Sequence, residues 1–168
     1  MSAADHDATE ISENRSWVSI HSLLTPDPRN AVALVGAPLA REALTAGRCD
    51  LAPDLVRASL TRLSVYDLES GTDLSALGIS DAGDLPVAAL TPAEAFATLS
   101  RGIRELTRRH ALTIVLGGHN AVTRPGVHGC GPSLKTTGLL TLDAHFVLPR
   151  TDRGTNNGNP TQDPPAAG

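Results

Sequence analysis

The chain has 168 residues, of which 40% are hydrophobic and 2% aromatic, and its formal net charge is −4 at pH 7. This length suits one domain with an aliphatic core, or a piece of a larger domain. Its dispersed lysines and arginines provide no basic surface for nucleic acid or an anionic membrane. No signal peptide or membrane-spanning run is visible, and Cys49 and Cys130 lack a disulfide or zinc spacing. We therefore expect a cytoplasmic protein with no nucleic-acid or membrane partner.

The amino-terminal part of the chain predicts a leader followed by a strand, a helix and a strand. Residues 1–30 mix charge, serine and proline, which is typical of a flexible leader, with a short ordered turn near 17–24. The continuous apolar run over 31–36 predicts a buried strand. An amphipathic helix is expected over 53–63 and a second strand over 64–68.

The middle of the chain continues this alternation. Residues 69–90 look loop-rich, and the acidic residues within 81–84 favour a turn with solvated carboxylates over a metal site. A threonine cap, a proline and a glutamate begin a helix that apolar spacing carries over 91–109. A strand follows over 112–116, and turn residues over 121–138 leave room for only a short helix. Such alternation predicts an α/β fold with a mainly parallel sheet covered by helices.

Two strand ends carry candidate metal ligands. The apolar run 139–142 leads into Asp143 and His145, and residues two apart in a strand point the same way. His119 follows a Gly-Gly step at the end of the preceding strand. Nitrogen and oxygen ligands of this kind suit manganese, iron(II) or zinc better than calcium. A strand that merely ends in polar residues is the alternative for 139–145 taken alone.

The last segment changes in composition. Residues 149–168 contain several prolines and glycines and almost nothing apolar, so we expect a loop-like, disordered tail. The domain itself is then expected over residues 31–148.

At these motifs the chain resembles the ureohydrolase superfamily, which comprises arginase, agmatinase and formimidoylglutamase. The resemblance covers roughly residues 31–160 and depends on three segments: 116–119, 142–145 and 157–160. Residues 36–38 and 52–57 give looser support. It implies an arginase-like, three-layer α/β/α fold. It also implies hydrolysis of a C–N bond in a linear amidine or guanidine by a hydroxide that bridges two manganese ions.

The resemblance implies that His119, Asp143 and His145 are metal ligands. It also implies that Asn157 and Asn159 bind the substrate. It leaves the register of the first motif open. An ungapped match places Asn120 in the ligand position and His119 where the family motif has an aspartate.

Several departures weaken the implied activity. Val147 stands where the family motif has a bridging carboxylate, and Thr161 where arginase has a proton-shuttling histidine. Family members are also much longer, and their later half supplies further carboxylate ligands. With three ligands at most, we expect no more than one manganese ion. We assign no catalytic residue, and we expect a truncated chain that is weakly active or inactive.

Whether the chain is an enzyme is therefore uncertain from sequence. If it is active, its substrate is a small amidine or guanidine, and it can form a homo-oligomer. The alternative is a non-catalytic binding or assembly module that pairs with a full-length paralogue through an open sheet edge.

Overall fold

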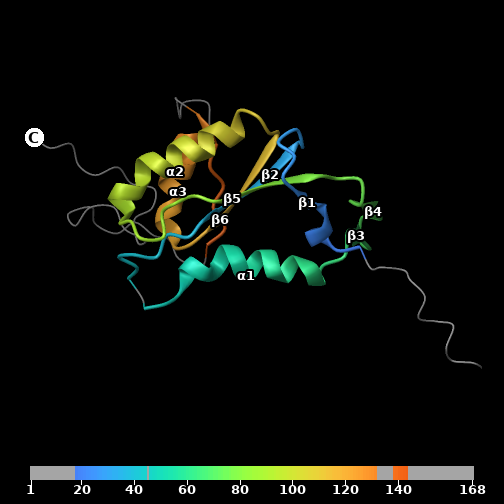
Figure 1. Cartoon of the computed structure of the whole chain (residues 1–168), viewed down its shortest axis with the longest axis horizontal. Coiled ribbons are helices and arrows are strands. Elements are labelled where there is room, and N and C mark those ends of the chain that lie inside the picture. The colour runs from blue at the N-terminus through green and yellow to red at the C-terminus, as the bar shows by residue number, and fades with distance from the viewer. Residues whose placement is uncertain (1–17, 45, 132–137, 144–168) are drawn as a thin grey trace, which may run out of the picture.

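A computed structural model describes residues 18–44, 46–131 and 138–143, and its centre is a parallel sheet of four strands (Figure 1). The strands lie in the order β1-β5-β2-β6 and have these bounds: β1 Leu24–Thr25, β2 Val32–Ala37, β5 Ile79–Asp84 and β6 Leu112–Gly117. β2 is the central strand, and its pairing with β6 is unbroken from Val32–Leu112 to Ala37–Gly117. All but the first residue of β2 are buried, as its apolar run predicts.

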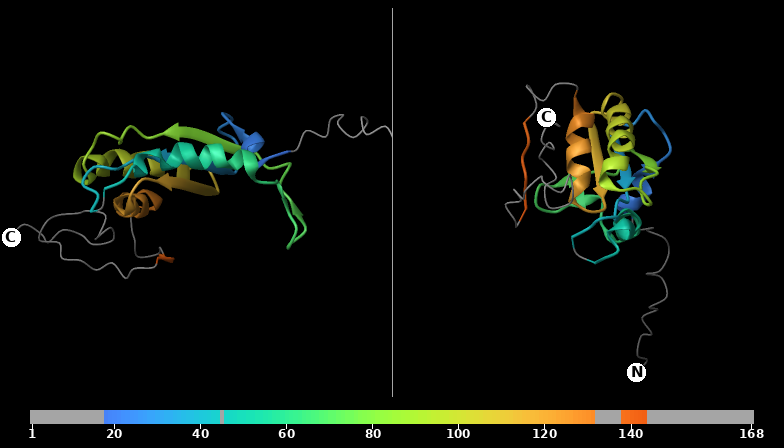
Figure 2. Two further views of the ribbon diagram at one scale, coloured as in Figure 1. Left: turned by 90° about the horizontal axis from the view of Figure 1, so that it is seen from below. Right: turned by 90° about the vertical axis from the view of Figure 1, so that its left-hand side faces the viewer.

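Helices cover both faces of the sheet. α1 (Ala52–Ser59) lies on one face, and α2 (Pro92–Thr107) and α3 (Thr123–Cys130) lie on the other (Figures 1 and 2). The connection from β2 to β5 crosses the sheet in one direction, and the connection from β5 to β6 returns past β2. Because parallel crossovers are right-handed, opposite directions place the helices on opposite faces. The predicted three-layer α/β/α fold is confirmed.

Short elements complete the described part of the chain. Four are single turns of 3-10 helix: η2 Ile20–Leu23, η3 Cys49–Leu51, η4 Leu60–Arg62 and η5 Asn120–Val122. Two form an exposed antiparallel hairpin: β3 Tyr66–Asp67 and β4 Thr72–Asp73.

Two apolar clusters hold the three layers together. On the face of α2, buried residues of the sheet, of the loops after it and of the helix pack together: Ala37, Leu39, Val87, Ala95, Leu99 and Ala121. On the opposite face, a second cluster joins η2, β2, β5 and the segment before β3: Leu23, Leu34, Val65 and Ile79. The two clusters are aliphatic, as the scarcity of aromatic residues predicts.

The expected boundary of the domain at residue 31 lies too late. The ordered turn foreseen near residues 17–24 continues into β1, which pairs with β5 at the edge of the sheet. Leu23 is only 6% exposed, so this segment contributes to the core. The sheet therefore begins within the predicted leader, where Leu24 and Thr25 pair with Ile79 and Ser80.

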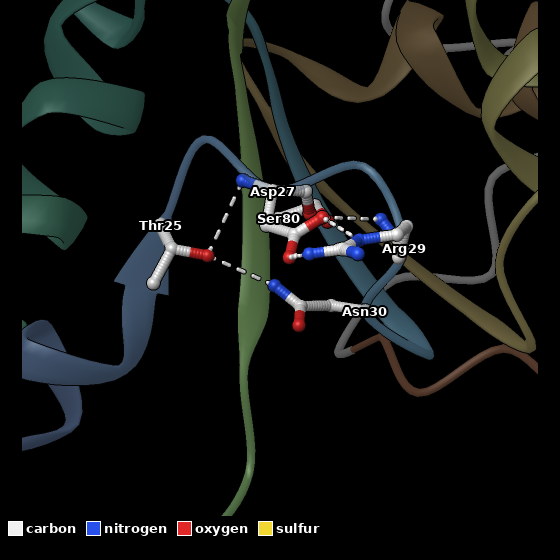
Figure 3. A network of polar contacts seen from close by, with 5 residues as sticks. All are labelled: Thr25, Asp27, Arg29, Asn30 and Ser80. Carbon is white, nitrogen blue, oxygen red and sulfur yellow. Dashed lines mark hydrogen bonds and ion pairs between the residues drawn. The ribbon is translucent and has the colours of Figure 1, made fainter.

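Side-chain hydrogen bonds order the loop between β1 and β2 (Figure 3). The Thr25 hydroxyl accepts from Asn30 Nδ2 at 2.9 Å and from the Asp27 backbone N–H at 3.4 Å. The Asp27 carboxylate accepts three hydrogen bonds from the guanidinium of Arg29. Ser80 of β5 donates its hydroxyl to the Asp27 carbonyl, which ties the loop to the sheet.

The second strand of the sheet was predicted in the wrong place. Residues 64–68 contribute only β3 of the exposed hairpin, whereas β5, within the predicted loop 69–90, joins the sheet between β1 and β2. Buried residues begin β5, but its second half is polar and contains Gly83 with φ 69°. The polar residues and the glycine make this part of β5 look like a turn in sequence. In the structure, Asp81 and Asp84 of β5 bind Arg57 of α1.

The apolar run before Asp143 also differs from its prediction as a buried strand. Residues 138–143 belong to no strand, and Leu140 and Leu142 are 86% and 92% exposed. A parallel strand is buried on both faces only where neighbouring strands and helices cover it. Within the described ranges no such neighbour is present for this segment.

Candidate functional site

The carboxyl ends of β2 and β6 are the place where an open α/β sheet binds ligands. These strands are neighbours, and the elements that follow them, α1 and α3, lie on opposite faces of the sheet (Figure 1). Such a reversal leaves the adjacent loops free to diverge above the strands. The Gly-Gly-His segment follows β6 directly, so the sequence places its candidate residue at this reversal.

Backbone hydrogen bonds extend the pairing of β2 and β6 beyond the ends of the strands. The Gly118 N–H donates to the Ala37 carbonyl at 2.8 Å, and the His119 N–H donates to the Leu39 carbonyl at 3.0 Å. A Cβ atom at position 118 would overlap the backbone of Leu39. The close approach of the two backbones therefore requires a glycine at position 118.

The imidazole of His119 adds a third link between the two loops. His119 is 7% exposed, and its Nε2 lies 2.9 Å from the carbonyl oxygen of Arg41. Nδ1 accepts the backbone N–H of Ala121 at 3.2 Å, which caps η5. Because a carbonyl only accepts and an N–H only donates, the ring is the neutral tautomer with its proton on Nε2.

Arg41 links the loop after β2 to a third strand end. Its Nη1 donates to the Ala89 carbonyl at 3.0 Å, in the segment between β5 and α2. The loops that follow β2, β5 and β6 are therefore joined by Arg41 and His119. This arrangement gives the carboxyl edge of the sheet a defined geometry.

A charged cluster lies at the carboxyl end of β5. The guanidinium of Arg57, from α1, donates to both oxygens of Asp81 at 2.9 and 3.0 Å and to Asp84 Oδ1 at 2.7 Å. It also donates to the Gly83 carbonyl at 3.0 Å. A Cβ at Gly36 would overlap the Asp84 carboxylate, so the glycine of β2 makes room for this cluster.

The charges of this cluster are partly withdrawn from water. The side chains of Arg57, Asp81 and Asp84 are 16%, 24% and 33% exposed. Burial by itself lowers the pKa of Arg57, but hydrogen bonds to Asp81 and Asp84 outweigh it and raise that pKa above its ordinary value. Arg57 therefore stays charged, and both carboxylates are engaged in holding α1 against β5.

Sequence reasoning missed this cluster. It weighed the carboxylates of 81–84 as a solvated turn or a metal site, and the structure pairs them with an arginine instead. The available signal was Arg57 itself, since an arginine on the inner side of a short helix requires acidic partners on the sheet.

The structure places two of the five predicted site residues. His119 is buried with both ring nitrogens hydrogen-bonded, and Asp143 is exposed in the segment 138–143. His145, Asn157 and Asn159 lie outside the described residues.

The described residues do not fit a two-ion metal centre. Across residues 18–44, 46–131 and 138–143, no group of three or more histidine, cysteine or acidic side chains could hold a metal ion. His119 has no ring nitrogen left for a metal, because one is protonated and the other accepts from Ala121. The ligand set that includes His145 stays a prediction.

Within the same described ranges, no helix is long and apolar enough to span a membrane.

Comparisons with known proteins point to one family. A sequence model of the arginase family matches residues 30–166. The formimidoylglutamase of Halalkalibacterium halodurans is 28% identical over 130 residues, covering 76% of this chain and 41% of that protein. The formimidoylglutamase of Bacillus subtilis is 25% identical over 131 residues with the same coverage. The chain thus spans about two fifths of the length of these curated relatives.

Solved structures show the same fold. The crystal structure of Bacillus subtilis formimidoylglutamase matches with a TM-score of 0.73 at 22% identity, covering 92% of this chain and 50% of that one. A manganese-containing variant of Trypanosoma cruzi formiminoglutamase matches with a TM-score of 0.72 at 27% identity, covering 85% of this chain and 50% of that one. The fold described above therefore corresponds to about half of each of these two matched chains.

Proposed function

Because the chain belongs to the arginase family, we propose that it forms the amino-terminal half of a manganese-dependent, formimidoylglutamase-type hydrolase fold. The reaction class is hydrolysis of a C–N bond in a linear amidine. The observation that carries this proposal is the family match over residues 30–166, together with formimidoylglutamases as relatives. A Trypanosoma cruzi relative solved with manganese supports the choice of metal.

We further propose that these 168 residues alone do not turn over substrate. A bridged hydroxide requires two metal ions and several carboxylates. His119 is buried and hydrogen-bonded through both nitrogens, and Val147 replaces a carboxylate of the family motif. These features support binding of at most one manganese ion, with Asp143 and His145 as its ligands and with the loop of Asn157 and Asn159 near the substrate.

Manganese titration of the full chain tests this proposal. Calorimetry should detect no more than one Mn²⁺ per chain, and assays with formimidoylglutamate, agmatine and arginine should release no formamide or urea. Val147→Asp should raise Mn²⁺ affinity about tenfold or more, because it restores a carboxylate to the motif. Val18→Asp, at a 45% exposed position, is the control for added charge. Two ions with turnover, or equal gains in the two variants, would contradict the proposal.

A further inference from the structure

We propose that residues 14–17, which lie outside the described ranges, dock on the exposed side of the β3–β4 hairpin, with Trp17 against Tyr66. This contact goes beyond the proposed function and does not depend on it. It depends on the apolar surface that the hairpin exposes, on the path of the chain that leads to the hairpin, and on the charges of the two segments.

The hairpin is a part of the molecule that needs further packing. It projects from the three layers, and each of its strands is two residues long and exposed (Figure 2). A two-stranded hairpin of this kind is marginally stable in water unless another element packs against it. Of residues 65–74, only Val65 belongs to an apolar cluster of the core.

The hairpin and its base expose large apolar side chains. Tyr66 and Leu68 are 47% and 88% exposed, and two further exposed residues lie at the base, Leu63 and Val18. Because side chains alternate along a strand, Tyr66 points away from the core that its neighbour Val65 enters. We call these four exposed residues the hairpin patch. A group of exposed apolar side chains marks a contact surface.

The described chain begins beside the hairpin patch. Ser19 forms an antiparallel bridge with Ser64, and the Ile20 N–H donates to the Leu63 carbonyl at 2.9 Å. In an antiparallel pair, one step back along the first segment is one step forward along the second. The residue before Ser19 is therefore level with the start of the hairpin, and Trp17 follows one step further along.

The charges of the two segments are complementary over this stretch. Residues 63–78 contain three carboxylates and no lysine, arginine or histidine: Asp67, Glu69 and Asp73. Arg15 is two residues before Trp17, so it reaches the turn of the hairpin when Trp17 covers Tyr66. Glu13 would be repelled by the same turn, because like charges on adjacent segments are destabilising. The docked segment therefore ends near residue 14.

The first test uses the only tryptophan and the only tyrosine of the chain, Trp17 and Tyr66. In the full chain, acrylamide should quench Trp17 fluorescence about threefold less than that of N-acetyltryptophanamide, because part of the ring is covered. Nuclear Overhauser spectra should show contacts between the indole and the Tyr66 ring. Equal quenching of the chain and the free amide, or absence of the ring contacts, would overturn the proposal.

The second test removes part of the hairpin patch. Leu68→Ser should raise the quenching of Trp17 about twofold, because the most exposed apolar side chain of the patch is lost. Leu55→Ser is the matched control, since Leu55 is 61% exposed on α1, and quenching should stay as in the wild type. The same quenching in the two variants would show that Trp17 is shielded elsewhere and would overturn the proposal.

The third test changes charge and leaves the hairpin patch intact, so it decides the question even if Leu68→Ser disturbs the hairpin. Arg15→Glu should raise the quenching of Trp17, and Glu69→Arg in the same chain should reverse that rise, because the exchange restores opposite charges. No difference among these chains would contradict the proposal. Shielding that increases with protein concentration would also contradict it, since Trp17 would then bind a second copy of the chain.

Discussion

Arg57 joins three parts of the molecule through one side chain. It extends from α1, binds Asp81 and Asp84 at the end of β5, and reaches the Gly83 carbonyl between them. Because the Arg57 side chain is only 16% exposed, removal of its charge would leave two neighbouring carboxylates partly buried without a counter-charge. Each charge of the cluster therefore stabilises the fold only while its oppositely charged partner is present.

Arg57→Met should lower the free energy of unfolding by about 2–4 kcal/mol, because it keeps the apolar stem but removes the charge. Urea denaturation of the full chain measures this. The control is Arg48→Met, which breaks the exposed ion pair of Arg48 with Asp50 and should leave the unfolding midpoint nearly unchanged. Equal effects of the two substitutions would show that the Arg57 cluster behaves like an ordinary surface pair.

At this scale the sequence revealed residue types better than their partners. His119 was recognised as a candidate, but whether its nitrogens face a metal or backbone depends on Arg41, 78 positions earlier in the chain. Asp81 and Asp84 were noticed too, and their pairing with Arg57 spans 24 and 27 positions. Local patterns contain no information on contacts of that range, so these roles required the fold.

Helix α2 shows the opposite case, since its start is determined locally. Thr91 Oγ1 accepts from the Glu94 N–H at 3.4 Å, and Glu94 Oε2 accepts from the Thr91 N–H at 2.8 Å. This capping box, with Pro92 at the first helical position, was predicted from three residues within a stretch of four. The expected helix over 91–109 agrees with Pro92–Thr107 to within two residues at its end.

Thr91→Ala should destabilise the chain by about 1 kcal/mol, because it removes the side-chain acceptor of the cap. Thermal unfolding followed by circular dichroism measures the change. Thr98→Ala, within the same helix, is the control, since alanine has the higher helix propensity there. A Thr91→Ala variant as stable as wild type would mean that packing alone sets the start of α2.

The loop between β1 and β2 provides a pH-dependent contact. The side-chain and backbone hydrogen bonds from Arg29 lower the pKa of Asp27 from 3.8 to about 2. A lowered pKa means that the contribution of Asp27 to stability is present above about pH 4 and is lost as pH falls toward about 2. An NMR titration of the Asp27 carboxyl carbon should show this pKa. Arg29→Gln should return it toward 3.8, and a wild-type pKa near 4 would contradict the assignment.

Strands were predicted less well than helices, for a physical reason. β2 and β6 are continuous apolar runs and were recognised, because parallel strands are buried on both faces. β5 escaped recognition since half of it carries the carboxylates for Arg57. Residues 139–142 have the composition of a buried strand but no described neighbour to bury them. The apolar composition of a segment indicates that it requires burial, whereas its actual burial depends on whether the rest of the sheet covers it.

For the molecule as a whole, the outer side of β6 is an open edge of the described sheet. Among the described residues β6 pairs only with β2, and Leu112 and Ile114 are 54% and 38% exposed. On the face of α2 and α3, a hollow of about 300 Å³ adjoins the same strand, lined in part by Thr113 and Val115. An unpaired parallel edge with apolar residues favours association with other chains.

We expect the 168-residue chain to associate as its concentration rises, because each copy presents this edge. Leu112→Lys should reduce the association, since lysine on an edge strand opposes pairing. Leu68→Lys, at an 88% exposed position near the β3–β4 hairpin, is the control and should leave it unchanged. Sedimentation velocity over a range of concentrations distinguishes these outcomes. A wild-type chain that stays monomeric throughout would contradict the expectation.

The central place of β2 has a consequence for the order in which the chain can fold during synthesis. β2 is made early, but its two partners, β5 and β6, begin at residues 79 and 112. A ribosome must therefore release the chain through Gly117 before the most buried strand has both neighbours. Until then its apolar residues are open to chaperones, and the rate of closure is limited by contacts distant in sequence.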